Sequence, residues 1–550
     1  MLLRGTAIVS VLTLLSRLLG FVRDLLVARL LGASLFADAF FVAFRIPNLL
    51  RSFVAEGALT SAFTPVFSSA LTKSKDEARE TVRRIIGFLL VITLALTALL
   101  VVFAPAIIDL MAPGFRGKGS KFELCVKLTR MMAPYIACVS LIALINAALN
   151  ALNIFGASAW AQVVMNLVLI VGALLATPFD LTTATVVLAL SVLIGGVIQV
   201  LFQVPACRRS GLSLKPSARL FSRDVRDVVK LMIPATLGAS VYQITIFMST
   251  ILASLLPSGS VSWLFYADRV AQFPIGVFSV ALASVLLPAL ANASAKSDDS
   301  AFTRNLSNSL RYTSFCIIPM SVGIAVLSLP ITKLLFERGA FDQVSSLKTA
   351  LALQALCFGL WASSCYSMLA RAFIARKDTL TPSLIGIASL MINLIVSLSL
   401  MGALKVGSDA GYITRTLEAL QIAVTGVFPF SSNLGHVGLA AASSVAALAS
   451  LVFALWLFRF KLGVFPWSDF ISATWRSLGA SLCMAVVVKL VIGTIQNPVW
   501  ACVFGMFLGA ATFIVASFLV NSRELKEALL VARAKLRKRG KTPPCCESRS

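Results

Sequence analysis

Charged side chains are scarce in this sequence of 550 residues. Only 13% of the residues are Asp, Glu, Lys or Arg, whereas about a quarter of a typical soluble domain is charged. This shortage argues against a soluble globular protein, and 58% of the residues are hydrophobic. Apolar runs of about 20 residues recur along the whole chain, which is the length that crosses a bilayer as a helix. The sequence therefore predicts an all-α polytopic membrane protein.

The sequence also lacks the residues of most catalytic sites. His436 is the only histidine, so neither a histidine-based metal site nor a catalytic triad can be built. No Walker A loop, G-x-S-x-G motif or H-E-x-x-H motif is present. The ten cysteines include no C-x-x-C pair, and most lie in apolar runs as small buried side chains. We expect a protein that is not an enzyme and needs no cofactor or metal, and we assign no role to Cys545 and Cys546.

Hydropathy predicts about fourteen transmembrane helices, and the loop charges predict their orientation. About thirty Lys and Arg residues lie on the side of the termini and about ten on the other, so both termini are expected in the cytoplasm. The same distribution argues against a nucleic-acid partner despite the net charge of +25, because the cations fill short loops. The predicted spans are 6–31, 34–68, 85–111, 126–152, 158–177, 184–205, 228–256, 262–293, 305–332, 346–374, 380–404, 436–459, 470–494 and 499–521.

Part of the chain repeats itself. Thr64–Arg79 resembles Leu287–Arg304, with prolines, lysines and aspartates at a constant offset. Both copies end an even-numbered span and open a cytoplasmic loop, which favours two six-span halves in the same orientation, with the site at their interface. Chance similarity of two amphipathic loop entries is the alternative. We expect an N-lobe at 1–217, a C-lobe at 218–465, two further helices at 466–521 with a Gly505-x-x-x-Gly509 packing face, a basic cytoplasmic tail at 522–550, and a long outer loop at 405–433.

The segment Ser16–Glu56 carries charges inside an apolar sequence. Four arginines facing lipid would cost roughly 10–14 kcal/mol, so they must face one another, a water-filled cavity or an anionic ligand. In the second half, Tyr266–Arg269 places an Asp–Arg pair inside the eighth span. Arg29 and Arg45 fit side chains that snorkel to an interface. The candidate site residues are Arg17, Arg23, Asp24, Asp38, Arg51, Glu56 and Arg269.

These charges allow two interpretations. In the first, the arginines line a cationic cavity of an anion transporter, and the acids orient them until a ligand arrives. Arginine suits a diphosphate because its planar fork donates two parallel hydrogen bonds. In the second, the charges are ion pairs that hold the helix bundle together.

The charged segment also resembles a known family. The stretches Ser16–Asp24 (SRLLGFVRD), Ala37–Arg51 (ADAFFVAFRIPNLLR), Phe53–Gly57 and Tyr266–Arg269 (YADR) are similar to the MurJ/MviN family of lipid II flippases, within the multidrug/oligosaccharidyl-lipid/polysaccharide exporter superfamily. The likeness extends over nearly the whole chain. It implies that undecaprenyl-diphosphate-linked peptidoglycan precursor moves from the cytoplasmic to the periplasmic leaflet of the bacterial inner membrane. It also implies that the seven candidate residues line a central cavity and that the last two spans form a groove for the lipid tail.

The sequence departs from that family in two respects, in the outer loop Lys405–Asn433, which is longer than usual, and in its acids, and it leaves several functions open. Some members use acids in spans seven and eleven or twelve to bind sodium, but neither Ile233–Leu256 nor Ser383–Leu404 contains an acid. The expected partners are lipid II and membrane lipids, with cell-wall synthesis or division proteins as further candidates. The alternative functions are a flippase for another polyprenyl-linked saccharide, a drug antiporter of the same superfamily, and a cell-wall scaffold without transport activity.

Overall fold

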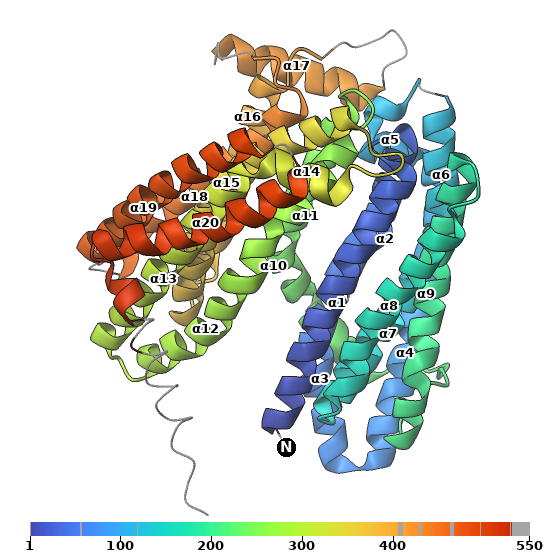
Figure 1. The fold of residues 1–550 in the computed structure, drawn as a ribbon. Helices are drawn as coiled ribbons and strands as arrows, with labels where there is room; N and C mark the ends of the chain where they lie inside the picture. The colour runs from blue at the N-terminus through green and yellow to red at the C-terminus, as the bar shows by residue number, and fades with distance from the viewer. Residues whose placement is uncertain are drawn as a thin grey trace, which may run out of the picture. The chain divides into compact units, whose positions relative to one another are not determined.

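The computed structural model describes residues 2–54, 58–117, 119–404, 411–427, 432–462, 467–495, 497–527 and 530 (Figure 1). The described part is all-helical and contains no strand, which confirms the predicted fold class. Its elements are α1 (Leu2–Leu31), α2 (Leu35–Val54), α3 (Ala58–Lys73), α4 (Lys75–Val102), α5 (Ala104–Met111), η1 (Pro113–Phe115), α6 (Ser120–Met132), α7 (Tyr135–Ala151), α8 (Phe155–Leu175), α9 (Leu181–Arg209), α10 (Arg223–Ser254), α11 (Ser260–Pro274), η2 (Ile275–Ser279), α12 (Val280–Ala295), α13 (Asp299–Val326), α14 (Ser328–Phe336), α15 (Gln343–Ala375), α16 (Leu380–Leu400), α17 (Tyr412–Val427), α18 (His436–Leu462), α19 (Trp467–Thr494) and α20 (Pro498–Leu519).

Eleven helical segments of the described chain are long and apolar enough to cross a membrane. They correspond to eleven of the predicted spans. The other three predicted spans fall on α1, on α2 with α3, and on α10. α1 and α2 each carry several charged residues, which lowers their apolar character. The range 34–68, predicted as one span, contains the two helices α2 and α3. The count of fourteen therefore stays a prediction.

Polar side chains at the helix starts fix where several helices begin. Ser74, Asp180 and Ser222 each accept a hydrogen bond from a backbone N–H in the first turn of α4, α9 and α10. Such caps satisfy donors that have no partner inside the helix. Asn497 does the same for α20, whose first residue is Pro498. Hydrogen bonds from Thr183 lower the pKa of the exposed Asp180 carboxyl, as expected for a charged cap.

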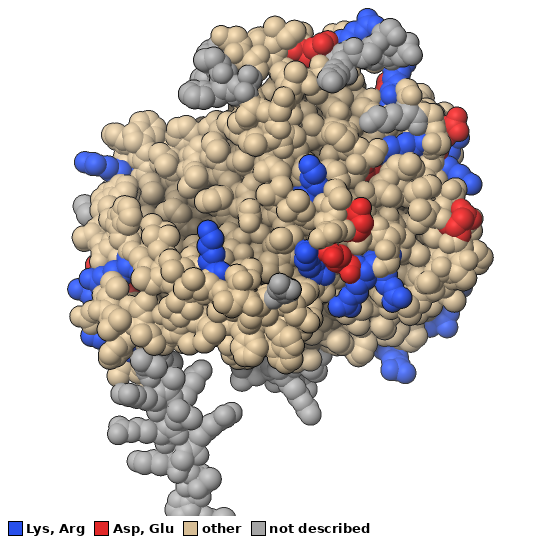
Figure 2. Space-filling model, turned by 45° about the horizontal axis from the view of Figure 1, so that its top comes forward, with Lys and Arg blue, Asp and Glu red and all other residues tan. Residues whose placement is uncertain are grey.

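The surface of the molecule suits a lipid solvent. Large apolar side chains are exposed on many helices, among them Val285, Phe507 and Leu519. Figure 2 shows one face on which uncharged residues predominate and charged ones are scattered. An exposed apolar area of this extent is rare on soluble monomers and marks contact with membrane or protein.

The chain divides into two compact units. The first comprises Met1–Arg269, Leu335–Ala352 and Leu390–Ala442, and the second comprises the remaining residues. The predicted lobes at 1–217 and 218–465 stay a prediction, as do the boundaries of the tail.

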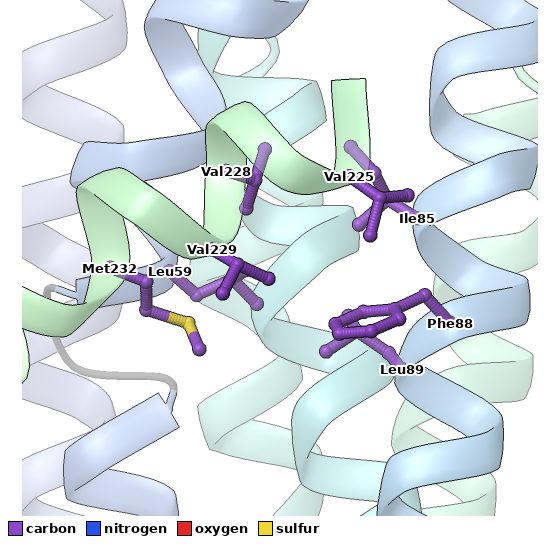
Figure 3. A pocket seen from close by; sticks show the side chains of 8 residues that line it. All are labelled: Leu59, Ile85, Phe88, Leu89, Val225, Val228, Val229 and Met232. Atoms are coloured by element: carbon purple, nitrogen blue, oxygen red, sulfur yellow. The ribbon is translucent and has the colours of Figure 1, made fainter. Parts of the chain in front are cut away.

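The first unit is tightly packed where α3, α4, α7 and α10 meet. Phe63 and Phe67 are fully buried there, with ring centroids 5.2 Å apart. Figure 3 shows a small gap between α3, α4 and α10, about 10 Å³ in volume and lined by apolar side chains such as Phe88 and Met232. A space of this size and polarity stays dry.

In the second unit, α19 and α20 run side by side and pack on α13 (Figure 1). A Cβ added at Gly505 or Gly509 would lie within 3.0 Å of Leu327 or Val488, so these glycines permit the close approach that the sequence predicted. The chain after α20 is anchored by Glu524, whose carboxylate accepts a hydrogen bond from buried Arg311 at 2.7 Å.

A helix lies where a long loop was expected. Within 405–433, the structure contains α17, whose residues Thr414, Leu417 and Gln421 recur at helical spacing and are buried. The Gln421 amide donates to the carbonyls of Leu398 and Gly402, both at 2.8 Å. These bonds dock α17 onto the C-terminal end of α16, and the opposite face of α17 is exposed.

Candidate functional site

Two arginines from different helices share one buried aspartate. Asp24 of α1 accepts hydrogen bonds from Arg23 at 2.7 and 3.0 Å through one carboxylate oxygen. Its other oxygen lies 3.2 Å from Nε of Arg269 on α11. The Asp24 side chain is only 8% exposed, whereas that of Arg269 is 37% exposed. One carboxylate cannot neutralise two guanidinium groups, so the group keeps a net positive charge.

An amide from a third helix fixes the position of Arg23. Asn166 of α8 accepts a hydrogen bond from Arg23 at 3.1 Å, and its amide donates to the Ser16 carbonyl of α1 at 2.8 Å. The guanidinium of Arg269 in turn lies over the ring of Phe265, 4.8 Å from its centroid. We call Arg23, Asp24, Asn166 and Arg269 the Asp24 cluster.

The Asp24 cluster lies deep in both of its charged helices. Arg23 is eight residues before the end of α1, about 12 Å along the axis, and Arg269 is nine residues after the start of α11, about 14 Å. These depths approach half of a hydrocarbon layer of about 30 Å. Cations at such depth are expensive unless they meet water, a counter-ion or a ligand.

The remaining predicted site residues lie apart from these contacts. Arg17 is exposed and has no ion pair among the described residues. Arg51 is half-buried, and its guanidinium and that of Arg23 both interact electrostatically with the phenol of buried Tyr135. Glu56 lies outside the described residues. Arg45, expected to snorkel, donates instead to Thr250 of α10.

Asp38 belongs to a second, fully buried arrangement. Its carboxylate pairs with Lys121 of α6 at 2.8 Å and accepts from the backbone N–H groups of Gly259 and Ser262 and from the Ser262 hydroxyl, at 2.7–2.9 Å. Asp38 and Lys121 are 1% and 3% exposed. Asp38 thereby caps the N-terminus of α11, where the helix dipole favours a negative charge. We call Asp38, Lys121, Gly259 and Ser262 the Asp38 clamp.

Aromatic packing supports the Asp38 clamp from the neighbouring turn. Phe41 of α2 stacks on Phe265 of α11 with ring centroids 3.9 Å apart. Tyr266 is fully buried and contacts Phe336 and Phe341 with centroid distances of 5.1 and 5.4 Å. The start of α11 is thus held by both ionic and apolar contacts.

Comparison with known proteins gives the family. The family model described as lipid II flippase MurJ matches residues 27–408. The chain belongs to this family. It is 32% identical over 530 residues to the probable lipid II flippase MurJ of Buchnera aphidicola subsp. Acyrthosiphon pisum, which covers 94% of this chain and 97% of that protein. It is 35% identical over 397 residues to the lipid II flippase MurJ of Burkholderia cenocepacia, covering 71% and 77%.

Solved structures agree with this assignment. A lipid II flippase MurJ in an inward closed conformation superposes with a TM-score of 0.75 at 27% identity, covering 93% of this chain and 98% of that one. A multidrug resistance MATE family transporter of the MOP superfamily, in an inward-facing conformation, gives a TM-score of 0.64 at 15% identity and shares the fold alone. Family membership and the apolar helices make the chain a multi-pass inner-membrane protein of a transporter family.

The family assignment does not by itself say which residues act. The sequence pointed to Arg23, Asp24 and Arg269, which the structure brings together. It missed Asn166, although Met165–Leu167 resembles Ile392–Leu394 in the second half and could have drawn attention to it. It also missed Lys121, which pairs with Asp38. Among the described residues, no three His, Cys, Asp or Glu side chains gather as a metal ion would require.

Proposed function

We propose that this protein flips lipid II, the undecaprenyl-diphosphate-linked peptidoglycan precursor, from the cytoplasmic to the periplasmic leaflet. Membership of the lipid II flippase family supports the substrate. The Asp24 cluster supports the mode of recognition, because it offers two incompletely neutralised guanidinium groups around one buried carboxylate. That shared carboxylate is the single observation that carries the proposal.

The diphosphate of the substrate would compete with Asp24 for the two arginines. Before binding, Asp24 holds Arg23 and Arg269 in position, and Asn166 fixes the remaining nitrogen of Arg23. A diphosphate can replace the carboxylate on both guanidinium groups, each of which donates paired hydrogen bonds to phosphate oxygens. Arg17 and Arg51 add positive charge to the same proposed cavity.

Alternating access would expose this cavity to one leaflet at a time. With both termini in the cytoplasm, the Asp38 clamp lies toward the periplasmic ends of α2 and α11, and its formation corresponds to a closed outer side. The lobes would then rock so that the clamp opens while the polyprenyl chain stays in lipid. An interior-negative potential favours outward movement of an anion by about 2.3 kcal/mol per charge per 100 mV.

The alternative functions differ in the charges that they require in the proposed cavity. A drug antiporter for organic cations would need a net acidic cavity, whereas four of the six described candidate residues are arginines. The activity of a non-transport scaffold would not change when residues of the Asp24 cluster are replaced. A flippase for another polyprenyl-diphosphate saccharide would use the same arginines, and the head group distinguishes it.

The decisive experiment compares Arg23→Ala and Arg269→Ala with Arg23→Lys and Arg269→Lys. The readouts are complementation of a depleted strain and binding of purified protein to lipid II or to a neutral-headed polyprenyl lipid. Each alanine variant is expected to bind lipid II about 10- to 100-fold more weakly, since each removes charge-assisted hydrogen bonds. The lysine variants keep the charge but lose the planar fork, so their binding should be intermediate.

Arg130→Ala is the matched control. This arginine is exposed on α6 and donates only to the Val101 carbonyl among the described residues. Full activity of both alanine variants in the Asp24 cluster would reject the proposed site. Equal binding of the neutral-headed lipid would reject diphosphate recognition, and preferential binding of a different polyprenyl-diphosphate saccharide would reject lipid II as the substrate.

A further inference from the structure

The second unit contains a cleft that is separate from the Asp24 cluster. It has a volume of about 600 Å³ and lies between the end of α13, α14, α15, α19 and the start of α20, close to the turn that joins α19 and α20. A pocket of this volume is in the range that holds small ligands. Most of its lining is apolar, including Val326, Ile492 and Phe358, and the Phe358 side chain is 74% exposed.

Among the described residues, two lysines are the only charged side chains that line this cleft. Lys333 comes from α14 and Lys489 from α19, and the described lining residues include no acid. Neither lysine has an ion pair or a hydrogen bond among the described residues. The N-terminus of α20, which begins at Pro498 in the same lining, adds a partial positive charge. The cleft therefore combines an apolar wall with an uncompensated positive end.

The position of the lysines matches the polar boundary of a membrane. Lys489 lies five residues before the end of α19, about 7–8 Å along the axis. Its ammonium can reach the level of lipid head groups while its stem stays among apolar side chains. The cleft is thus apolar toward the membrane interior and cationic toward the interface. This arrangement is complementary to a molecule that has an acyl chain and an anionic phosphate.

We propose that this cleft binds an anionic membrane phospholipid, with one phosphodiester between Lys333 and Lys489 and an acyl chain along the apolar wall. Among the described residues of the lining, the amide of Gln354 is the only other side-chain hydrogen-bonding group. A saccharide-peptide head group would need many more polar partners, because each buried polar group left unpaired costs about 1–3 kcal/mol. The lining therefore favours a small head group over the transported lipid.

The test measures lipid binding to the purified full chain by native mass spectrometry after delipidation. Phosphatidylglycerol is the probe, and phosphatidylcholine is the zwitterionic comparison. The wild-type protein is expected to prefer phosphatidylglycerol, and Lys333→Gln with Lys489→Gln should lower that preference about 30-fold, since each interfacial cation contributes roughly fivefold. Each single variant should lower it about fivefold.

Lys296→Gln is the control, because this lysine is exposed after α12 and outside the cleft. It should keep the full preference, and so should Lys333→Arg with Lys489→Arg, which preserves both charges if the glutamine variants fold poorly. Equal binding of the two phospholipids, or an unchanged preference in the double glutamine variant, would overturn the proposal. Displacement of phosphatidylglycerol by inorganic phosphate alone would also overturn the proposal and assign the cleft to a soluble anion. A parallel loss of lipid II binding in the double glutamine variant would overturn it too and assign the cleft to the substrate.

Discussion

Replacing Lys121 by Met tests whether the Asp38 clamp depends on its buried ion pair. The substitution keeps an unbranched side chain against Phe115, whose ring centroid lies 4.1 Å from the lysine nitrogen, but removes the charge. Asp38 would stay buried and charged, with its three hydrogen bonds from Gly259 and Ser262 as remaining compensation. The complementary change, Asp38→Asn, leaves the Lys121 ammonium buried without a carboxylate.

The structure gives the expected size of each effect. Breaking a buried pair by removing one partner costs about 3–5 kcal/mol, because the other charge stays uncompensated. The hydrogen bonds to Asp38 should place Lys121→Met near the lower end of that range and Asp38→Asn near the upper end. The double variant has no charge to compensate, so its free energy of unfolding should exceed the additive expectation by about 2–3 kcal/mol.

Reversible unfolding in mixed detergent micelles measures these free energies. Arg116→Met is the matched control, because Arg116 pairs with Asp109 at 2.9 Å but its side chain is 50% exposed. An exposed pair contributes about 1 kcal/mol or less, so this variant should change stability little. If the changes in free energy of unfolding caused by Lys121→Met and Asp38→Asn added up within about 0.5 kcal/mol in the double variant, the buried ion pair would not be the source of the stabilisation.

Three further outcomes are expected. Burial would raise the pKa of Asp378, between α15 and α16, but hydrogen bonds and the Lys461 ammonium outweigh it and lower this pKa to about 2. The ionised carboxylate therefore contributes about 1–2 kcal/mol to the free energy of unfolding above the unfolded pKa near 3.8, and this contribution is lost as the pH falls through about 2. Asp378→Asn should remove this part of a pH–stability profile. Gly32→Ala should lower the thermal midpoint, since φ is +61° and the new Cβ would lie 2.2 Å from the Ala340 carbonyl oxygen, and an unchanged midpoint would contradict that geometry. Gln421→Ala should detach α17 at a cost of about 1–3 kcal/mol, seen as faster proteolysis within 411–427, and wild-type cleavage rates would show that α17 is held otherwise.

The helical fold could be predicted because its main signal is local. Apolar runs of sufficient length give membrane helices whatever their neighbours are, and eleven such segments lie where hydropathy placed them. The three predicted spans that the described residues do not match by length and hydropathy are 6–31, 34–68 and 228–256, and the helices α1 and α2 in the first two of them carry several charges. The helix α17 was taken for a loop because its segment is short and mixed in polarity, and its stability depends on Gln421 binding to carbonyls of another helix.

The sequence by itself predicted that arginines inside apolar spans need a partner, because the cost of a charge in hydrocarbon depends on the residue and its depth and not on the rest of the fold. It also carried the family, since the motifs around Arg23 and Arg269 are contiguous. Only the tertiary structure decided the partners, because hydrogen bonds and ion pairs depend on distances in space. Asn166 is 143 residues from Arg23, and Lys121 is 83 residues from Asp38. In the structure, the Asp24 carboxylate is shared by two arginines, whereas Asp38 caps α11. Sequence spacing alone could not distinguish these two environments.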